Sequence, residues 1–207
     1  MPRPRVYDPD SVLDAAESLV AQSGPAGVTT RAVATAAGVS NGAIYHNFGS
    51  RAELVARTWL RAARRFLDVQ SELVDHALTD PSVDPVEAVV AAADAPVVFS
   101  GCRPESAALL LQVPREQLLG DDLPADLTRE LDELDHRLLA LMKRLSTLMW
   151  DRRDRAAVDA ITICIVDLPT SIILSRNRIT DSWARNRLKA AVRAVLADEP
   201  TTRSAEK

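Results

Sequence analysis

Side chains that can hydrogen-bond gather in one short stretch of the sequence, residues 29–51, which reads TTRAVATAAGVSNGAIYHNFGSR. Hydroxyl, amide, imidazole and guanidinium groups bind the phosphate oxygens and base edges of nucleic acids. No large aliphatic residue interrupts the polar side of residues 40–47. The stretch therefore predicts a surface that contacts DNA, with these candidate residues: Thr29, Thr30, Arg31, Ser40, Asn41, Gly42, Tyr45, His46, Asn47 and Arg51.

Two short helices joined by a tight turn would position these candidates. The pattern predicts one helix over about residues 30–37 and a second over about residues 41–47, with Thr29 and Ser40 as N-caps. Gly38 lies between them, where the chain must turn sharply and positive φ is often needed. Such a pair is a helix-turn-helix, whose second helix enters the DNA major groove. An ordinary helical hairpin remains the alternative.

Residues 37–55, AGVSNGAIYHNFGSRAELV, resemble the N-terminal signature of TetR/AcrR-type transcriptional regulators. The resemblance covers about residues 8–60. The chain departs from the usual pattern at Arg51, Ala43 and Asn47, where the family often has Lys, Thr and His. The resemblance implies an all-α protein in which a three-helix helix-turn-helix domain precedes a helical bundle, with about nine helices in total. It places the DNA-binding domain at residues 1–54 and the effector-binding and dimerisation domain at residues 55–207.

The resemblance also implies how such a protein works. A homodimer would bind a palindromic operator on double-stranded DNA, and a small-molecule effector would release it, which favours a repressor over an activator. The operator sequence and the effector are left open. A regulator that binds DNA without any effector is an alternative on the same fold.

Composition and charge agree with a helical DNA-binding protein. Hydrophobic residues make up 47% of the chain but aromatic residues only 4%, so the core consists of Leu, Val, Ala and Ile, which suits helices. Residues 1–65 carry eight arginines against five acidic residues, a balance of +3, whereas the rest carries 17 basic and 24 acidic residues, a balance of −7. Arg3 and Arg5 stand in an N-terminal arm that could reach DNA. DNA binding is therefore expected to fall steeply with salt.

The body of the chain predicts long amphipathic helices over about residues 51–78, 123–150, 152–174 and 181–197. The last two carry apolar residues that could form a dimer interface or complete the core of one chain: Val158, Ile161, Ile165, Trp183, Leu188, Val192, Val195 and Leu196. Residues of the central helices could line an effector pocket, with ordinary core or surface as the alternative: Phe99, Cys102, Leu110, Met142, Met149, Trp150 and Asp167.

Other kinds of chemistry find little support in the sequence. No phosphate-loop or zinc-protease motif occurs, and neither an enzyme nor a cofactor is expected. Cys102 and Cys164 lack metal-ligand spacing, so no metal site is expected either. A redox sensor built on these two cysteines is a further alternative, and it requires their Cα atoms to lie within about 7 Å. Neither a signal peptide nor a membrane span is evident, which predicts a cytoplasmic protein.

Overall fold

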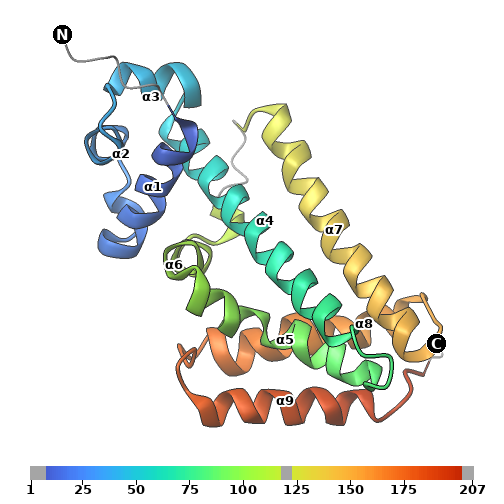
Figure 1. Cartoon of the computed structure of the whole chain (residues 1–207). Coiled ribbons are helices and arrows are strands. Elements are labelled where there is room, and N and C mark those ends of the chain that lie inside the picture. Colours follow the sequence, from blue (N-terminus) through green and yellow to red (C-terminus); the bar gives the residue numbers. More distant parts are fainter. Residues whose placement is uncertain (1–7, 118–122, 202–207) are drawn as a thin grey trace, which may run out of the picture. The chain divides into compact units, whose positions relative to one another are not determined.

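The computed structural model describes residues 8–117 and 123–201, and these residues form helices and no strand, as Figure 1 shows. The all-α prediction is confirmed. The α-helices are α1 (Pro9–Ser23), α2 (Thr30–Ala37), α3 (Asn41–Phe48), α4 (Arg51–Ala77), α5 (Pro85–Cys102), α6 (Pro104–Gln112), α7 (Ala125–Trp150), α8 (Arg155–Thr162) and α9 (Ser182–Leu196). The arginines of the N-terminal arm, Arg3 and Arg5, lie outside the described residues.

The chain packs as two compact units. Unit 1 consists of the chain up to Arg64 together with Arg103–Asp132, and unit 2 consists of Arg65–Cys102 and the chain from Glu133 onwards. Helices α4 and α7 each contribute a segment to both units. These packing units differ from the predicted functional domains, residues 1–54 and 55–207, because α6 and the first turns of α7 pack in unit 1.

Helix α1 begins and ends where local chemistry dictates. The Asp8 side chain accepts a hydrogen bond from the backbone N–H of Asp10 at 3.1 Å, and Pro9 occupies the first helical position. Gly24, at φ +70°, ends the helix. One face of α1 is buried in the core of unit 1, through Val12, Ala16 and Val20. This packing fixes α1 against α2 and α6.

A buried ion pair ties α1 to α4 and α6 within unit 1. Glu17 of α1 is only 3% exposed, and its carboxylate accepts hydrogen bonds from Arg61 Nη2 at 2.9 Å and from Ser106 Oγ at 2.7 Å. The same guanidinium also bonds the more exposed Asp14, at 2.7 Å, and Asp10. One arginine of α4 therefore forms ion pairs with three acidic residues of α1.

In unit 2, α5 and α9 lie side by side in Figure 1 and are joined by ion pairs. Asp94 is 6% exposed and accepts two hydrogen bonds from Arg185, at 2.7 and 2.6 Å, while Lys189 Nζ lies 3.0 Å from its carboxylate. Two turns earlier on α5, Glu87 pairs with Arg193 at 2.8 Å. Burial raises the pKa of Asp94, but the hydrogen bonds from Arg185 and Lys189 outweigh it, so the pKa lies below its ordinary value.

Helix α5 continues through Pro96, which lies inside it. Proline has no N–H, so it leaves the carbonyl four residues earlier, that of Ala92, without its helical donor. Gln70 of α4 supplies the missing donor, because its Nε2 hydrogen-bonds the Ala92 carbonyl at 3.0 Å. The helix therefore extends to Cys102.

Pro169 is accommodated differently. The helix that starts as α8 continues through two π-helical segments, Ile163–Asp167 and Thr170–Leu174, which flank this proline. The wider π-helical turns pair each N–H with a carbonyl five residues earlier, as in the bond from Ser175 N to Thr170 O at 2.8 Å. Pro169 is thus accompanied by a local change of helix type.

Candidate nucleic-acid interface

The helix-turn-helix has the local geometry that its sequence predicts. Thr29 Oγ1 accepts a hydrogen bond from Ala32 N, and Ser40 Oγ accepts one from Ala43 N, both at 3.1 Å, so each hydroxyl caps its helix. Gly38 has φ +69° and ψ +31°, the left-handed conformation that glycine adopts without strain. These three residues fix the turn between α2 and α3.

The apolar residues of α2 and α3 face inwards. Val33, Ala34, Ile44 and Phe48 are all less than 5% exposed. Ala34 is small, so the two helices can approach closely. The opposite side of α3 must then face solvent, which determines where the candidate DNA-binding residues lie.

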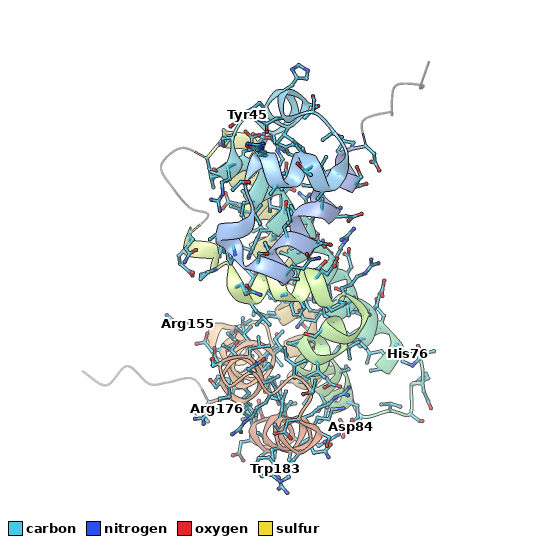
Figure 2. All side chains as sticks on the ribbon, turned by 90° about the vertical axis from the view of Figure 1, so that its left-hand side faces the viewer. Tyr45, His76, Asp84, Arg155, Arg176 and Trp183 are labelled. Atoms are coloured by element: carbon cyan, nitrogen blue, oxygen red, sulfur yellow. The ribbon has the colours of Figure 1, made fainter. Side chains whose placement is uncertain are left out.

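Most of the predicted DNA-binding residues are accessible in the structure. Nine of the ten are exposed and Thr30 is half-buried. Tyr45 is 52% exposed, and Figure 2 shows it on the outer side of the helix-turn-helix. Its hydroxyl accepts a hydrogen bond from Thr30 Oγ1 at 3.4 Å, which links α3 to the start of α2.

Ser40, Asn47 and Arg51 bond to the backbone of the chain, in addition to the contacts of Thr29, Thr30 and Tyr45 described above. Asn47 Nδ2 donates to the Ala43 carbonyl of its own helix at 2.8 Å, and Ser40 serves as the N-cap. Arg51 donates from Nη2 to the Pro25 carbonyl at 2.7 Å and from Nε to the Val28 carbonyl, which anchors the start of α4 to the segment before α2. The hydrogen bonds of these three side chains help to position the helices.

Three other candidates have side chains without such partners. Arg31, Asn41 and His46 make no side-chain hydrogen bond or ion pair with the rest of the described chain. Their polar groups point to solvent from α2 and α3. They are therefore the side chains most available to a ligand.

The surface carries little net charge. Residues 8–64 contain five arginines and five acidic residues, so the +3 balance of the first 65 residues comes from Arg3, Arg5 and Arg65. Arg57, Arg61 and Arg64 are engaged in ion pairs with residues of unit 1, namely Glu53, Asp126, Asp10, Asp14, Glu17 and Glu130. The basic N-terminal part that the sequence indicates is therefore largely neutralised within the fold.

The predicted effector residues lie in different surroundings, although Met149 and Trp150 pack against the same core cluster that contains Met142. Phe99 is buried edge-on against Phe66, with ring centroids 5.5 Å apart, and Met142 is buried. Met149 and Trp150 are half-buried, Cys102 and Asp167 are exposed, and Leu110 lies in unit 1 while the other six lie in unit 2.

One polar residue of unit 2 was missed by the sequence analysis. Gln70 is 1% exposed, and its Oε1 has no hydrogen-bond partner among the described residues. Its position four residues after Phe66, on the apolar face of α4, was the available signal, because a polar residue there must be buried.

Two surface grooves also occur in unit 2. One has a volume of about 770 Å³ and lies along α8, lined by Asp159, Ile163 and Asp167 among others. The second, of about 600 Å³, is lined by residues of α4, α5 and α9 and carries charged groups that include Glu87, Asp94 and Lys189. Apart from Asp167, neither groove contains a predicted effector residue.

The predicted dimer residues divide into two groups. Ile161, Ile165, Leu188, Val192 and Leu196 are at most 4% exposed within their own chain, so they are part of the core of unit 2. Val158 and Val195 are half-buried. Trp183 is 60% exposed and points outwards in Figure 2, with the Arg187 guanidinium 5.5 Å from its ring centroid. Ile163, 41% exposed, was not predicted.

The cysteines do not form a disulfide. Cys102 is exposed and Cys164 is buried, and burial raises the pKa of the Cys164 thiol to about 12. A thiol with so high a pKa is a poor nucleophile at neutral pH. Nothing in the described residues therefore favours the redox-sensor alternative. These residues also contain no group of three metal-ligating side chains.

Comparison with known proteins places the helix-turn-helix in a family. Residues 12–58 match the model described as bacterial regulatory proteins, tetR family. No curated protein matches the chain.

Solved structures share the fold over most of the chain. A TetR-like transcriptional regulator from Rhodococcus sp. RHA1 has a TM-score of 0.64 and 19% identity, and the match covers 96% of this chain and all of the other. A TetR-family transcriptional regulator from Streptomyces coelicolor has a TM-score of 0.63 and 20% identity, with 91% and 97% covered. The fatty acid degradation regulator FadR from Bacillus halodurans has a TM-score of 0.62 and 16% identity, with 93% and 100% covered.

Residues 12–58 therefore match the model of the tetR family, and the chain has the fold of TetR-like regulators. Both findings confirm the resemblance inferred from the sequence.

Proposed function

We propose that the protein is a dimeric repressor that binds a palindromic operator and leaves it when a small-molecule effector binds. The observation that carries the DNA-binding part is the exposed polar surface of α3, with Asn41, Tyr45 and His46 facing solvent on a domain of the TetR family. Such a regulator acts on DNA in the cytoplasm.

The ten candidate residues take different roles in this proposal. Asn41, Tyr45 and His46 contact base edges or phosphates in the major groove, and Arg31 contacts the backbone with Thr29 and Thr30. Ser40, Asn47 and Arg51 act mainly by fixing α3 and the start of α4, because their side chains already bind carbonyls or N–H groups of the chain. Gly42 is treated below.

A second copy of the chain would supply the other half of the operator contact. Two-fold symmetry places two recognition helices about 34–36 Å apart, one turn of DNA. The exposed apolar residues Ile163 and Trp183 support an interface on the last two helical segments, since both would otherwise remain in water. The groove along α8 adds an uneven surface there that a partner could fill.

The effector is proposed to bind in unit 2. The support is Gln70, whose buried Oε1 has no hydrogen-bond donor among the described residues. Gln70 lies four residues after Phe66 in α4, and Phe66 packs edge-on against Phe99 of α5. An apolar molecule that carries a hydrogen-bond donor fits such surroundings. Release would follow if the effector binds better to a conformation in which the recognition helices no longer match the operator.

The test begins with selection of bound duplexes from genomic fragments that neighbour the gene. Tyr45→Ala is expected to weaken binding to a selected duplex at least tenfold, because each base contact is worth about 1–3 kcal/mol. Leu139→Ala, which removes a 38% exposed side chain from α7, is the matched control and should bind like the wild type.

Three outcomes would count against the proposal. If the wild-type protein selects no duplex, it is not a DNA-binding regulator. If Tyr45→Ala binds as tightly as Leu139→Ala, Tyr45 has no role on DNA. If no compound from a screen releases the selected duplex, the ligand-independent regulator is favoured instead.

A further inference from the structure

Gly42 is a glycine that the fold itself does not require. Gly24, Gly38 and Gly49 have positive φ, and a Cβ at Gly27 would come within 2.6 Å of the Ser23 side chain. At Gly42, φ is not positive, and an added Cβ would meet only Ser40 Oγ, at 3.8 Å, which is an ordinary van der Waals contact.

Keeping glycine at this position lowers the stability of the protein. Gly42 is the second residue of α3, where glycine is less stable than alanine by at most the roughly 0.5–1 kcal/mol of a helix interior. An added Cβ would make only one ordinary contact within the described chain. The described chain therefore gives no structural reason for the glycine.

The position of Gly42 identifies the neighbour that needs it. Residues three and four positions apart on a helix lie on one face, so Gly42 lies one turn before Tyr45 and His46. Asn41 is adjacent, and all four residues are exposed. Gly42 thus lies in the middle of the surface proposed to contact DNA.

The low charge of this surface makes close approach necessary. Within α2 and α3, Arg31 is the only arginine or lysine. Neutral hydrogen bonds need donor–acceptor distances of about 2.7–3.2 Å, whereas ionic attraction acts over longer distances. A helix that binds with amide, hydroxyl and imidazole groups must therefore lie directly against the duplex.

We propose that the DNA duplex imposes the glycine: the α3 backbone at Gly42 contacts the DNA directly, and a Cβ there would hold Asn41, Tyr45 and His46 beyond hydrogen-bond distance. This inference rests on the proposed function. It adds that position 42 is selected for close contact against the stability of the chain, so a single methyl group should move stability and DNA affinity in opposite directions.

The experiment compares Gly42→Ala with Gly101→Ala and the wild type. Gly101 also lies in a helix, α5, is exposed and has no atom within 4 Å of an added Cβ, so it is a matched control. Thermal unfolding should show a Tm for Gly42→Ala that is equal to the wild type or higher by about 1–3 °C. Fluorescence anisotropy with a selected duplex should show binding weaker by about tenfold for each half-site, about a hundredfold for a dimer.

Gly101→Ala should gain similar stability and bind the duplex like the wild type. If Gly42→Ala binds as tightly as the wild type, the inference is overturned while the DNA-binding function stands. If Gly42→Ala has a lower Tm than the wild type, the fold needs the glycine and the inference is also overturned. If the wild type itself selects no duplex, the proposed function and this inference fail together.

Discussion

Replacing Arg61 with methionine is expected to destabilise the protein far more than an ordinary surface substitution. Methionine keeps most of the aliphatic stem but removes the guanidinium that pairs with Glu17. The Glu17 side chain is only 4% exposed, so the variant would take the Arg61 guanidinium away from a buried carboxylate that keeps its hydrogen bond from Ser106.

The size of the effect follows from the burial of each group. Removing one partner of a buried ion pair costs about 3–5 kcal/mol. Asp10 and Asp14 are 77% and 62% exposed, so water replaces their contacts with Arg61 and they add little. The hydrogen bond from Ser106 remains, which favours the lower end of the range, about 3 kcal/mol. For a chain of this length that lowers Tm by roughly 6–12 °C.

Urea denaturation followed by circular dichroism measures this difference, with Arg64→Met as the matched control. Arg64 pairs with Glu130 at 41% and 28% exposure, so its loss should cost less than about 1 kcal/mol. The double variant Arg61→Met, Glu17→Leu should recover part of the lost stability, because it removes the buried carboxylate together with its guanidinium partner. If the unfolding free energies of Arg61→Met and Arg64→Met differ by less than about 1 kcal/mol, the reasoning about Glu17 is refuted.

Two further predictions concern pH and salt. The folded pKa of Asp94 lies below its ordinary value of 3.8, so its ion pairs stabilise the protein fully above that value and lose their effect as pH falls through the folded pKa. At neutral pH the wild type should therefore have a larger unfolding free energy in urea than Asp94→Asn, and this difference should vanish in strong acid. A difference that persists in strong acid would contradict the stabilising role of the ionised Asp94. The slope of log K against log salt for operator binding should lie between about −2, for Arg31 of two chains, and about −5, if Arg3 and Arg5 also contact phosphates. A slope steeper than about −8 in an anisotropy titration would mean that ion-paired arginines reach the DNA.

Local chemistry explains why the helix-turn-helix could be predicted closely. Thr29, Ser40 and Asp8 cap helices through bonds to residues two or three positions away, and Gly38 permits a turn set by its own φ. These interactions are contained in a few consecutive residues. The predicted boundaries of α2 and α3 accordingly agree with the structure to within about one residue.

Long-range pairing explains what could not be predicted. The arginines of residues 51–64 read as a basic surface in the sequence, but Arg57 pairs with Asp126 and Arg61 with Glu17. Likewise, the apolar faces of the last two helices do not reveal whether they face their own core or a partner. Five of the predicted interface residues, among them Ile161 and Leu188, are buried in their own chain. Sequence periodicity shows that a residue is buried but not by which neighbour.

Gln70 and Pro96 form a dependent pair although 25 residues separate them in the sequence. The side-chain amide of Gln70 replaces the peptide N–H that Pro96 lacks. The effect of a substitution at either position therefore depends on the residue at the other. Loss of Gln70 alone leaves a carbonyl without a donor inside a helix, whereas with alanine at position 96 the backbone could supply that donor itself. The two substitutions should therefore be non-additive, and the continuity of α5 is encoded in α4.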